Sequence, residues 1–366
     1  YYQSGKLMRQ GFYKYGKEDS TWTIFYESGS KKAIENYVSA KKWGTNTYFH
    51  KSGKISQILH YEEDLADSTW TTYYENGQVK SREVWARGKK EGDWEYFFDN
   101  GKTERKGQFE KDKKQGKAET YFSNGKLESL QNYCSDAPCG TWEEYYIDGK
   151  IKFKKEYRDS FLLLWELRDD KGKTLVSNGN GSLTANYDNG IIRAMGSYKS
   201  GLQDGTWRFF HPNGELDYEA SYKEGLLDGY YSSYFKNHNI KSEGNFTANK
   251  KAGLWKFYRE NGKMEMKGTL QDNVREGVWN YYYFTGEKES EGNFVNDKQN
   301  GIWHYWYKTG EKWKEGSFEE GKKVGTWTTW WENGNKLQEG PYVNGIEDGV
   351  WTSWWQNGTK KDEGTI

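Results

Sequence analysis

The sequence contains no apolar run of the length that a membrane span requires. The longest run, residues 161–165 (FLLLW), is strand-sized, whereas a membrane-spanning helix needs roughly 18 residues. An excess of charge of one sign is also missing, because 54 Lys and Arg balance 54 Asp and Glu. A general basic field for binding nucleic acid is therefore absent. We expect neither a transmembrane segment nor a nucleic-acid partner.

The chain is poor in aliphatic residues and shows no 3.6-residue apolar period, so we expect no helices. Hydrophobic residues make up 34% of the chain and the mean hydropathy is −1.15, values that alone would point toward disorder. The aromatic content argues against disorder, because 19 Trp, 30 Tyr and 17 Phe are present. Each ring can bury roughly 150–250 Å², so the chain can fold around aromatic rings.

A glycine recurs at a fixed interval along most of the chain, which indicates a repeat protein. Gly310 and Gly334 are 24 residues apart, and the same step runs from Gly29 to Gly149 and again from Gly190 to Gly358, with His238 in place of Gly once. We therefore predict an N-terminal hairpin-repeat array over residues 1–167 and a C-terminal array over 168–366, with an irregular junction at about 158–189. Both ends of the sequence fall partway through a repeat, so we expect a longer parent protein.

Each unit has the composition of a β-hairpin. About seven residues rich in Thr, Tyr and Trp run into Asn-Gly or a similar pair, as in GTWTTWWENG at 325–334. Asn and Gly tolerate the positive φ of a tight turn, and a second strand and a longer loop follow. The predicted fold class is all-β: an elongated array of stacked antiparallel β-hairpins in one twisted meander sheet. At 24 residues each, 366 residues give about 15 units.

Counting along a unit predicts which residues face each other. We number the first Trp of a unit 0, which puts the closing Gly at +7. If Asn-Gly forms the turn, residues whose positions sum to 13 are opposed, so position 0 faces a Gly at +13. If the longer loop is also symmetric, Gly340 lies between Trp327 and Trp351. A large ring over a backbone without a side chain is a sound packing arrangement.

Opposed residues share a face of the sheet. Face A carries positions 0, +4, +9, +13 and +15 and is apolar almost throughout, so we predict that it is the structural face. Face B is mostly Thr, Lys and Glu, and we interpret its Glu at +12 as part of a solvated ladder beside Lys. The exception on face B is position +3, which is aromatic in every regular unit. In the C-terminal array this column of candidate partner-binding residues is Phe210, Tyr234, Tyr258, Tyr282, Trp306, Trp330 and Trp354.

The +3 column has two interpretations. The rings either shield the back of a thin sheet by packing on Lys and Thr methylenes, or form a regularly spaced strip for a partner protein or a glycan. The binding interpretation predicts that substitutions at Trp306, Trp330 and Trp354 weaken partner binding without lowering the melting temperature. Unfolding of the array by the same substitutions would identify the column as core.

Cys134 and Cys139 are the only cysteines, and the predicted pairing places them directly opposite each other across the longer loop. Opposed Cβ atoms lie about 4.5–5.5 Å apart, slightly more than a disulfide requires. They are a candidate disulfide, which would indicate an extracytoplasmic compartment: the periplasm, the cell surface or the medium. Two free thiols in a cytoplasmic protein are the alternative.

No residue pattern indicates chemistry. The five histidines lack metal-ligand spacing, the Gly-rich loops close hairpins and precede no helix, and no acid/base pair stands out. We therefore expect no catalytic residue, no metal and no cofactor, and a protein that is not an enzyme.

The pattern Gly-X-Trp-X-X-Tyr-Tyr-X-X-Gly followed by Glu-Gly-X-Phe, as in GVWNYYYFTGEKESEGNF at 277–294, resembles the bacterial variant of the MORN repeat. The Glu-Gly element is mostly missing from the N-terminal array. The resemblance implies stacked hairpins used as scaffolds and protein-binding surfaces, and some bacterial members are labelled antitoxins. We expect a non-catalytic scaffold for protein–protein interaction in the bacterial cell envelope or secreted, with a larger complex as one setting for it. A glycan- or cell-wall-binding module and a cytoplasmic antitoxin-type binding protein are the alternatives.

Overall fold

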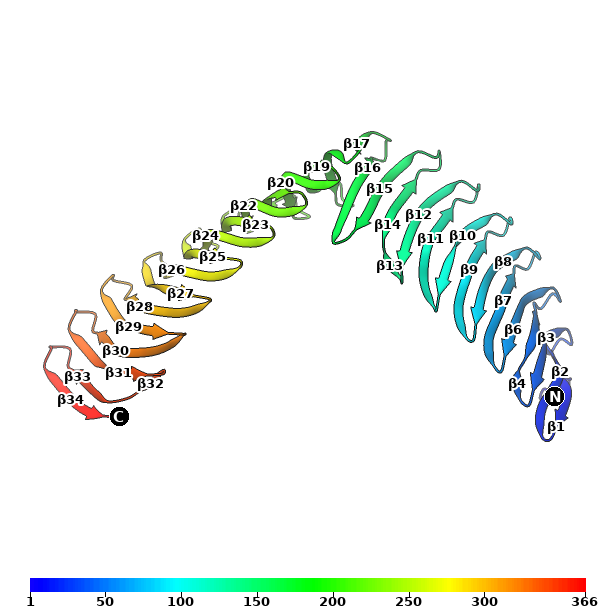
Figure 1. Cartoon of the computed structure of the whole chain (residues 1–366), viewed down its shortest axis with the longest axis horizontal. Helices are drawn as coiled ribbons and strands as arrows, with labels where there is room; N and C mark the ends of the chain where they lie inside the picture. Colours follow the sequence, from blue (N-terminus) through cyan, green and yellow to red (C-terminus); the bar gives the residue numbers. More distant parts are fainter. The chain divides into compact units, whose positions relative to one another are not determined.

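The computed structural model describes residues 1–366 and contains 34 strands and no helix. Contacts divide the chain into an N-terminal unit, Tyr1–Asn180, and a C-terminal unit, Gly181–Ile366. Within each unit the strands pair antiparallel, one hairpin after another (Figure 1). The predicted all-β array of stacked hairpins is confirmed. The division at Asn180 falls inside the irregular junction, C-terminal to the boundary expected near residue 168.

The strands of the N-terminal unit are β1 (Arg9–Lys14), β2 (Lys17–Phe25), β3 (Lys31–Val38), β4 (Lys41–Lys42), β5 (Gly44–Phe49), β6 (Ile55–Glu62), β7 (Leu65–Tyr73), β8 (Val79–Ala86), β9 (Lys89–Phe97), β10 (Thr103–Glu110), β11 (Lys113–Tyr121), β12 (Leu127–Cys134), β13 (Ala137–Pro138), β14 (Gly140–Tyr145), β15 (Ile151–Arg158), β16 (Phe161–Arg168) and β17 (Thr174–Ser177). Those of the C-terminal unit follow from the boundary onward: β18 (Asn180–Asn186), β19 (Ile192–Lys199), β20 (Leu202–Phe210), β21 (Leu216–Lys223), β22 (Leu226–Tyr234), β23 (Ile240–Thr247), β24 (Lys250–Tyr258), β25 (Met264–Gln271), β26 (Val274–Tyr282), β27 (Lys288–Val295), β28 (Lys298–Trp306), β29 (Lys312–Glu319), β30 (Lys322–Trp330), β31 (Lys336–Val343), β32 (Ile346–Glu347), β33 (Val350–Trp354) and β34 (Lys360–Thr365). No helix long and apolar enough to cross a membrane is present.

The pairing of the core Trp with Gly is confirmed. Trp327 is opposite Gly340 in the β30–β31 ladder, as counting predicted. The ring of the next Trp lies over the same glycine, because a Cβ atom added to Gly340 would be 2.1 Å from Trp351 Cδ2. A side chain cannot fit at that distance, so the Trp rings of the C-terminal unit, as they are placed, require glycine at +13. The N-terminal unit differs, because Leu59, Glu83 and Gln131 occupy +13 before a Trp there.

The core is a column of rings on face A. Trp255, Trp279, Trp303 and Trp327 are each at most 3% exposed. The aromatic at +15 packs edge-on against the next Trp, with the Phe318 and Trp327 ring centroids 5.1 Å apart at 87°. Position +2, which the pattern analysis did not assign, adds a further layer of half-buried rings to this column: Phe257, Tyr281 and Tyr305. The apolar face is therefore the structural face, as predicted.

In most units the side chain at +4 ties the unit to the next one, whereas Phe98, Phe122 and Phe235 have no polar group for this contact. The Tyr307 hydroxyl donates to the backbone oxygen of Trp330, 23 residues later, at 2.8 Å. Where the aromatic is lost the bond persists, since Arg259 Nη2 donates to Tyr282 O at 2.9 Å. A polar tip on this position satisfies a strand-end carbonyl that has no ladder partner.

The two kinds of turn are the reverse of the prediction. The expected longer loop is a two-residue turn, in which Asn296 and Asp297 both have positive φ (48° and 64°) and join β27 to β28. Such φ values are those of a primed hairpin turn. The Asn-Gly segment is wider: Trp331 N donates to Asn335 O at 2.8 Å, and within it only Gly334 has positive φ.

This wider turn shifts the register and overturns the assignment of position +9 to face A. Position +3 pairs with +9, so that Trp330 is opposite Lys336. Lys312, another +9 residue, places Nζ 2.7 Å from Glu315 Oε2 and 5.0 Å from the Trp330 ring centroid, on face B. The assignment failed because a bulge leaves one residue without a partner in each hairpin.

Candidate binding face

The +3 column of the C-terminal unit is half-buried on face B. Its three Trp rings are each covered by the Lys at +9 of the preceding unit: Lys288 on Trp306 (5.0 Å from Nζ to the ring centroid), Lys312 on Trp330 (5.0 Å) and Lys336 on Trp354 (5.5 Å). Where the column carries Tyr, the covering +9 residue is aliphatic: Leu216, Ile240 or Met264. The rings are thus packed into the sheet, with cation–π contacts worth about 0.5–1 kcal/mol each at such sites.

The Glu at +12 holds these lysines in place. Lys336 Nζ lies 2.6 Å from Glu339 Oε2, and this hydrogen bond lowers the pKa of the Glu339 carboxyl. Burial raises the pKa of Glu315, but hydrogen bonds from Lys312 and His304 lower it overall. The carboxylates remain ionised at neutral pH, and the Lys–Glu ladder beside the column is a paired network.

Face B also carries an exposed apolar column that the sequence analysis missed, at position −1. From Tyr230 to Val350 these side chains are 44–57% exposed, and Thr326 alone interrupts the series: Tyr230 (44%), Leu254 (52%), Val278 (57%), Ile302 (57%) and Val350 (54%). The missed signal was an apolar residue between the Gly at −2 and the Trp at 0, repeated at 24-residue intervals.

A bulge in the pairing between successive hairpins lies at this column. In the β25–β26 ladder Lys267 pairs with Asn280 and Thr269 pairs with Glu276, so one residue faces three. The Gly at −2 sits in this bulge, and Gly277 has φ of 69°. Val278 projects from the face opposite to Trp279, because successive strand residues alternate, and the bulge leaves it without a paired residue on β25.

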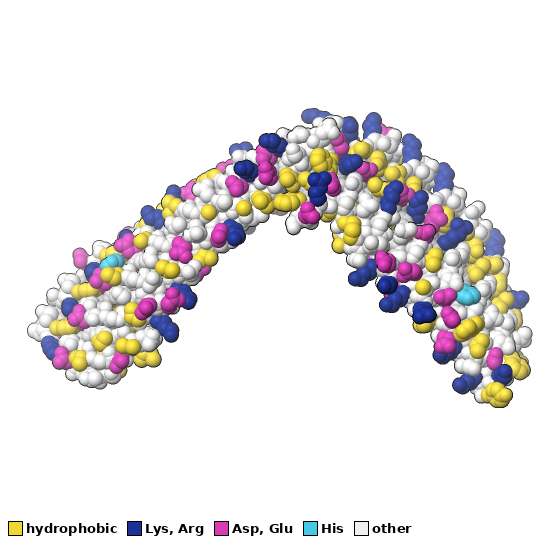
Figure 2. Space-filling model, in the orientation of Figure 1, with side chains coloured by type: hydrophobic (Ala, Val, Ile, Leu, Met, Phe, Trp, Pro, Cys, Tyr) yellow, Lys and Arg dark blue, Asp and Glu magenta, His cyan; other side chains and the backbone are white.

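Charges of both signs are interspersed with hydrophobic side chains over the visible surface of both units (Figure 2). The surface therefore offers no field of one sign to attract a polyanion or a polycation. Exposed apolar groups that recur at one structural position are the more specific feature, because soluble proteins seldom repeat them without a partner.

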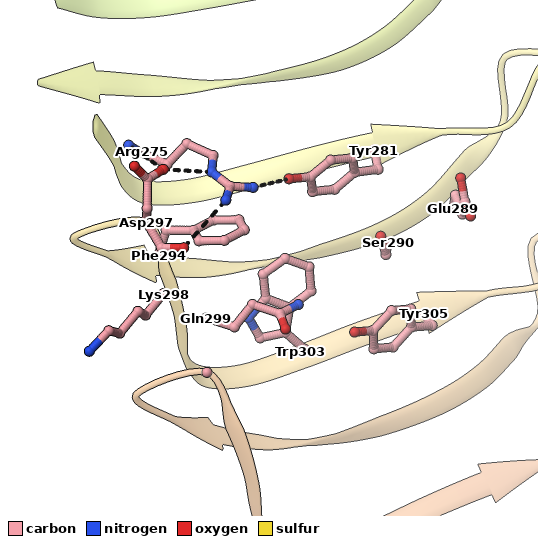
Figure 3. Close-up of a pocket in the computed structure, with 11 residues that line it drawn as sticks. Arg275, Tyr281, Glu289, Ser290, Phe294, Asp297, Lys298, Gln299, Trp303 and Tyr305 are labelled. Atoms are coloured by element: carbon pink, nitrogen blue, oxygen red, sulfur yellow. Dashed lines mark hydrogen bonds and ion pairs between the residues drawn. The ribbon is translucent and has the colours of Figure 1, made fainter. Parts of the chain in front are cut away.

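A depression of about 490 Å³ on the C-terminal unit is a part of the aromatic core (Figure 3). The Arg275 guanidinium lies 4.0 Å from the Phe294 ring centroid, and its Nε donates to Asp297 Oδ1 at 2.8 Å. The hydrogen bond from Arg275 lowers the pKa of Asp297. The polar groups at this rim are paired with one another and cover rings, which is a structural arrangement.

The histidines are dispersed along the chain. Each is near one or two hydrogen-bonding or acidic partners: His50 (Tyr73 O and Glu75), His60 (Thr45), His211 (Asp217), His238 (Glu215) and His304 (Glu315). No three His, Cys, Asp or Glu side chains are arranged to hold a metal ion.

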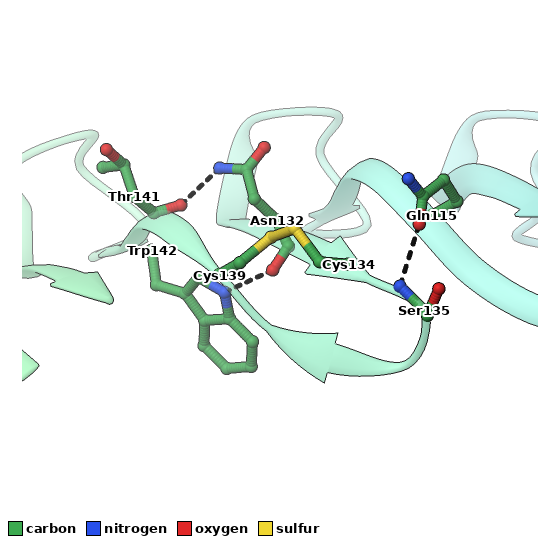
Figure 4. Close-up of a disulfide and its surroundings, with 7 residues drawn as sticks. All are labelled: Gln115, Asn132, Cys134, Ser135, Cys139, Thr141 and Trp142. Atoms are coloured by element: carbon green, nitrogen blue, oxygen red, sulfur yellow. Dashed lines mark hydrogen bonds between the residues drawn. A yellow bond between two sulfur atoms is a disulfide. The ribbon is translucent and has the colours of Figure 1, made fainter. Parts of the chain in front are cut away.

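Cys134 and Cys139 form a disulfide in the N-terminal unit (Figure 4). Their Cα atoms are 5.8 Å apart. The predicted direct opposition of the two cysteines is wrong. A two-residue turn pairs Cys134 with Ala137, and Cys139 lies two residues beyond Ala137. Cys139 N donates to Asn132 O at 3.0 Å, so the backbone of the second cysteine is bonded to Asn132 and not to Cys134.

Comparison with known families agrees with the repeat pattern. Eight segments match the family model described as MORN repeat variant: residues 66–85, 90–111, 114–135, 138–159, 203–224, 251–272, 275–296 and 323–344. They occur in both units. No curated protein sequence matches the chain.

Two toxin-complex structures align with most of the chain at very low similarity. One is a crystal structure of TcdB2-TccC3-Cdc42, with 10% identity and a TM-score of 0.17 over 93% of this chain and 24% of that chain. The other is a Photorhabdus luminescens Tc holotoxin pore, with 10% identity and a TM-score of 0.19 over 94% and 26%. The chain spans about a quarter of the length of these chains. Likeness at these TM-scores does not establish a shared fold.

Proposed function

The chain is built from repeats of the MORN variant family, and we propose that it is a non-catalytic scaffold that binds another protein on face B of its C-terminal unit. The observation that carries this proposal is the exposed apolar column at position −1. Leu254, Val278 and Ile302 occupy three successive hairpins, and each is more than half exposed. Nothing in their own unit covers them, and an apolar strip of this kind is typical of a protein interface.

A protein partner fits this face better than a glycan does. A sugar ring stacks on a free aromatic face, whereas Lys288, Lys312 and Lys336 already cover the Trp rings of the +3 column. The exposed groups are aliphatic and offer contact area without hydrogen bonds to hydroxyl groups. Dispersed aliphatic contacts flanked by polar side chains are the composition of a protein–protein interface.

We also propose an extracytoplasmic location, the cell envelope or the medium. The disulfide between Cys134 and Cys139 supports it, because cytoplasmic thiols stay reduced. Alkylation of the protein in intact cells, before lysis, followed by mass spectrometry tests this. Unmodified, linked cysteines are expected, and two alkylated thiols would contradict the location.

The scaffold proposal is tested by comparing the proteins retained by three immobilised chains. These are the wild type, the L254T/V278T/I302T variant and the control variant V343T, which alters an exposed Val (50%) outside the column. Threonine is tolerated at −1, because the N-terminal unit has Thr21 and Thr45 there. We expect a protein that the wild type and V343T retain and the triple variant loses. Equal retention by all three would refute binding through this face.

A further inference from the structure

The exposed apolar column is accompanied by a column of small polar side chains at position +14. Each −1 residue is opposite a +14 residue across its own hairpin, as in the pairs Val278–Asn293 and Ile302–Ser317. Side chains at +14 in the same stretch are Asn245, Thr269, Asn293 and Ser317, and none has a hydrogen-bond partner for its side chain. The backbone oxygen of each accepts a hydrogen bond from the indole N–H of the following Trp.

The same positions satisfy each other in part of the N-terminal unit. Thr21 Oγ1 donates to Asn36 Oδ1 at 2.6 Å, and Gln108 Nε2 donates to Asp93 Oδ1 at 2.8 Å. In three of the six regular hairpins of that unit the −1 and +14 residues form polar, hydrogen-bonded pairs, whereas others lack them, as in Thr69–Val84. In the C-terminal unit an aliphatic residue replaces one member and leaves the other without a partner. This difference at one structural position indicates that the C-terminal column serves a ligand rather than the hairpin.

The spacing of the columns selects a conformation for that ligand. Successive hairpins are two strands apart, so apolar and polar groups repeat about every 9.4–9.8 Å. A polyproline II helix repeats every three residues, about 9.3 Å, and presents every third side chain on one edge. A β-strand alternates its side chains between faces and an α-helix rises about 1.5 Å per residue, so neither returns a side chain to one edge at this interval.

Hydrogen bonding and charge agree with that spacing. Polyproline II has no internal hydrogen bonds, so its carbonyl oxygens are free to accept from Asn, Ser and Thr side chains. On the other border of the column, position −3 carries Asp228, Glu276 and Asp348, which form no ion pair within the chain, and Ala252 and Asn300 beside Leu254 and Ile302. The Asp228 and Glu276 carboxylates each accept one hydrogen bond from a backbone N–H of a turn. A basic residue on the ligand would complement these carboxylates, whereas a second copy of the acidic border would repel them.

We propose that face B of the C-terminal unit binds a polyproline II segment of its protein partner, with an apolar residue at every third position and Lys or Arg beside it. The apolar residues contact Leu254, Val278 and Ile302, and the segment's carbonyl oxygens accept hydrogen bonds from the +14 side chains. This proposal rests on the proposed scaffold function and specifies the conformation and composition of what it binds.

The test is fluorescence anisotropy of the full chain with labelled 17-residue peptides. The first probe has five Leu-Pro-Pro triplets, the second five Ser-Pro-Pro triplets, and the third alternates Val and Thr to favour a strand; all carry a Lys at each end. We expect the first probe to bind, the second to bind at least tenfold more weakly, and the third not to bind. The L254T/V278T/I302T variant should weaken the first probe at least tenfold, and V343T should not.

Asn293→Ala and Ser317→Ala together should weaken the first probe several-fold without changing the melting temperature. Equal binding of the Leu and Ser probes, or unchanged binding to the triple variant, would overturn the proposal. Binding of the strand probe that the triple variant abolishes would overturn the polyproline II conformation while leaving the scaffold function in place. A wild-type dimer that the triple variant converts to a monomer, measured by sedimentation, would assign the face to a second copy and refute both.

Discussion

Gly316 lies between two core rings, and its replacement by Ala is a severe and well-defined perturbation. It is opposite Trp303 in the β28–β29 ladder, and an added Cβ would be 2.1 Å from Trp327 Cδ2. The Trp327 ring is 3% exposed and packs against Phe318, so it has no free space to enter. Overpacking of this kind costs about 1–3 kcal/mol.

A displaced ring also loses a hydrogen bond. Trp327 Nε1 donates to Ser317 O at 3.2 Å, and leaving that buried donor without a partner costs about 1–3 kcal/mol. Together we expect Gly316→Ala to destabilise the C-terminal unit by roughly 2–6 kcal/mol, a fall in its Tm of about 4–24 °C at the usual scaling for a domain of this size. The repeat array is expected to lose stability locally, in the hairpins next to the substitution.

The matched control is Gly364→Ala. Gly364 occupies the same +13 position, opposite Trp351, but no heavy atom lies within 4 Å of an added Cβ because no Trp follows it in this sequence. Thermal unfolding followed by tryptophan fluorescence should show a large loss for Gly316→Ala and little change for Gly364→Ala. Equal effects of the two substitutions would refute the claim that the rings require glycine beneath them.

Three further outcomes follow from the contacts. Tyr307→Phe removes the hydroxyl that donates to Trp330 O at 2.8 Å, and urea unfolding should show a loss of about 0.5–1.5 kcal/mol. Burial raises the pKa of Glu119, but hydrogen bonds from two lysines outweigh it and bring the pKa from 4.5 to about 2. The contribution of Glu119 to the free energy of unfolding is therefore present above pH 4.5 and lost as the pH falls toward 2. Glu119→Gln should make the free energy of unfolding less dependent on pH over that window. The Cys134–Cys139 disulfide closes only a short loop, since the sequence separation is 5. Reducing it should therefore lower the free energy of unfolding by at most about 2 kcal/mol, measured by melting scans with and without reductant.

The sequence determined the period, the hairpins and the buried face because each depends on a local signal that repeats. The Trp–Gly opposition at Trp327 and Gly340 followed from counting alone, since the ladder is regular between them. Predictions near the turns failed for a different reason. A bulge changes the register by one residue without changing the composition, so Lys336 was assigned to the wrong face.

The apolar column at −1 was overlooked because composition does not report exposure. Val278 and Ile302 are ordinary strand residues in sequence. Alternation with the buried Trp places them on face B, but the sequence does not show that they are more than half exposed there. Conversely, the conspicuous Trp330 has a covering lysine, Lys312, that the pattern did not place beside it. Its role in binding stays a prediction, testable by the substitutions at the three Trp of the column.

The central claim is that the −1 column on face B of the C-terminal unit is the binding surface, and protection from hydroxyl-radical labelling tests it most directly. The chain is labelled alone and with the retained partner protein, and modification is measured residue by residue. We predict slower labelling at Leu254, Val278 and Ile302, with unchanged labelling at Val343 and Ile346, which are 50% and 71% exposed elsewhere in the unit. Protection at Val343 and Ile346 with none at the −1 column would contradict the account.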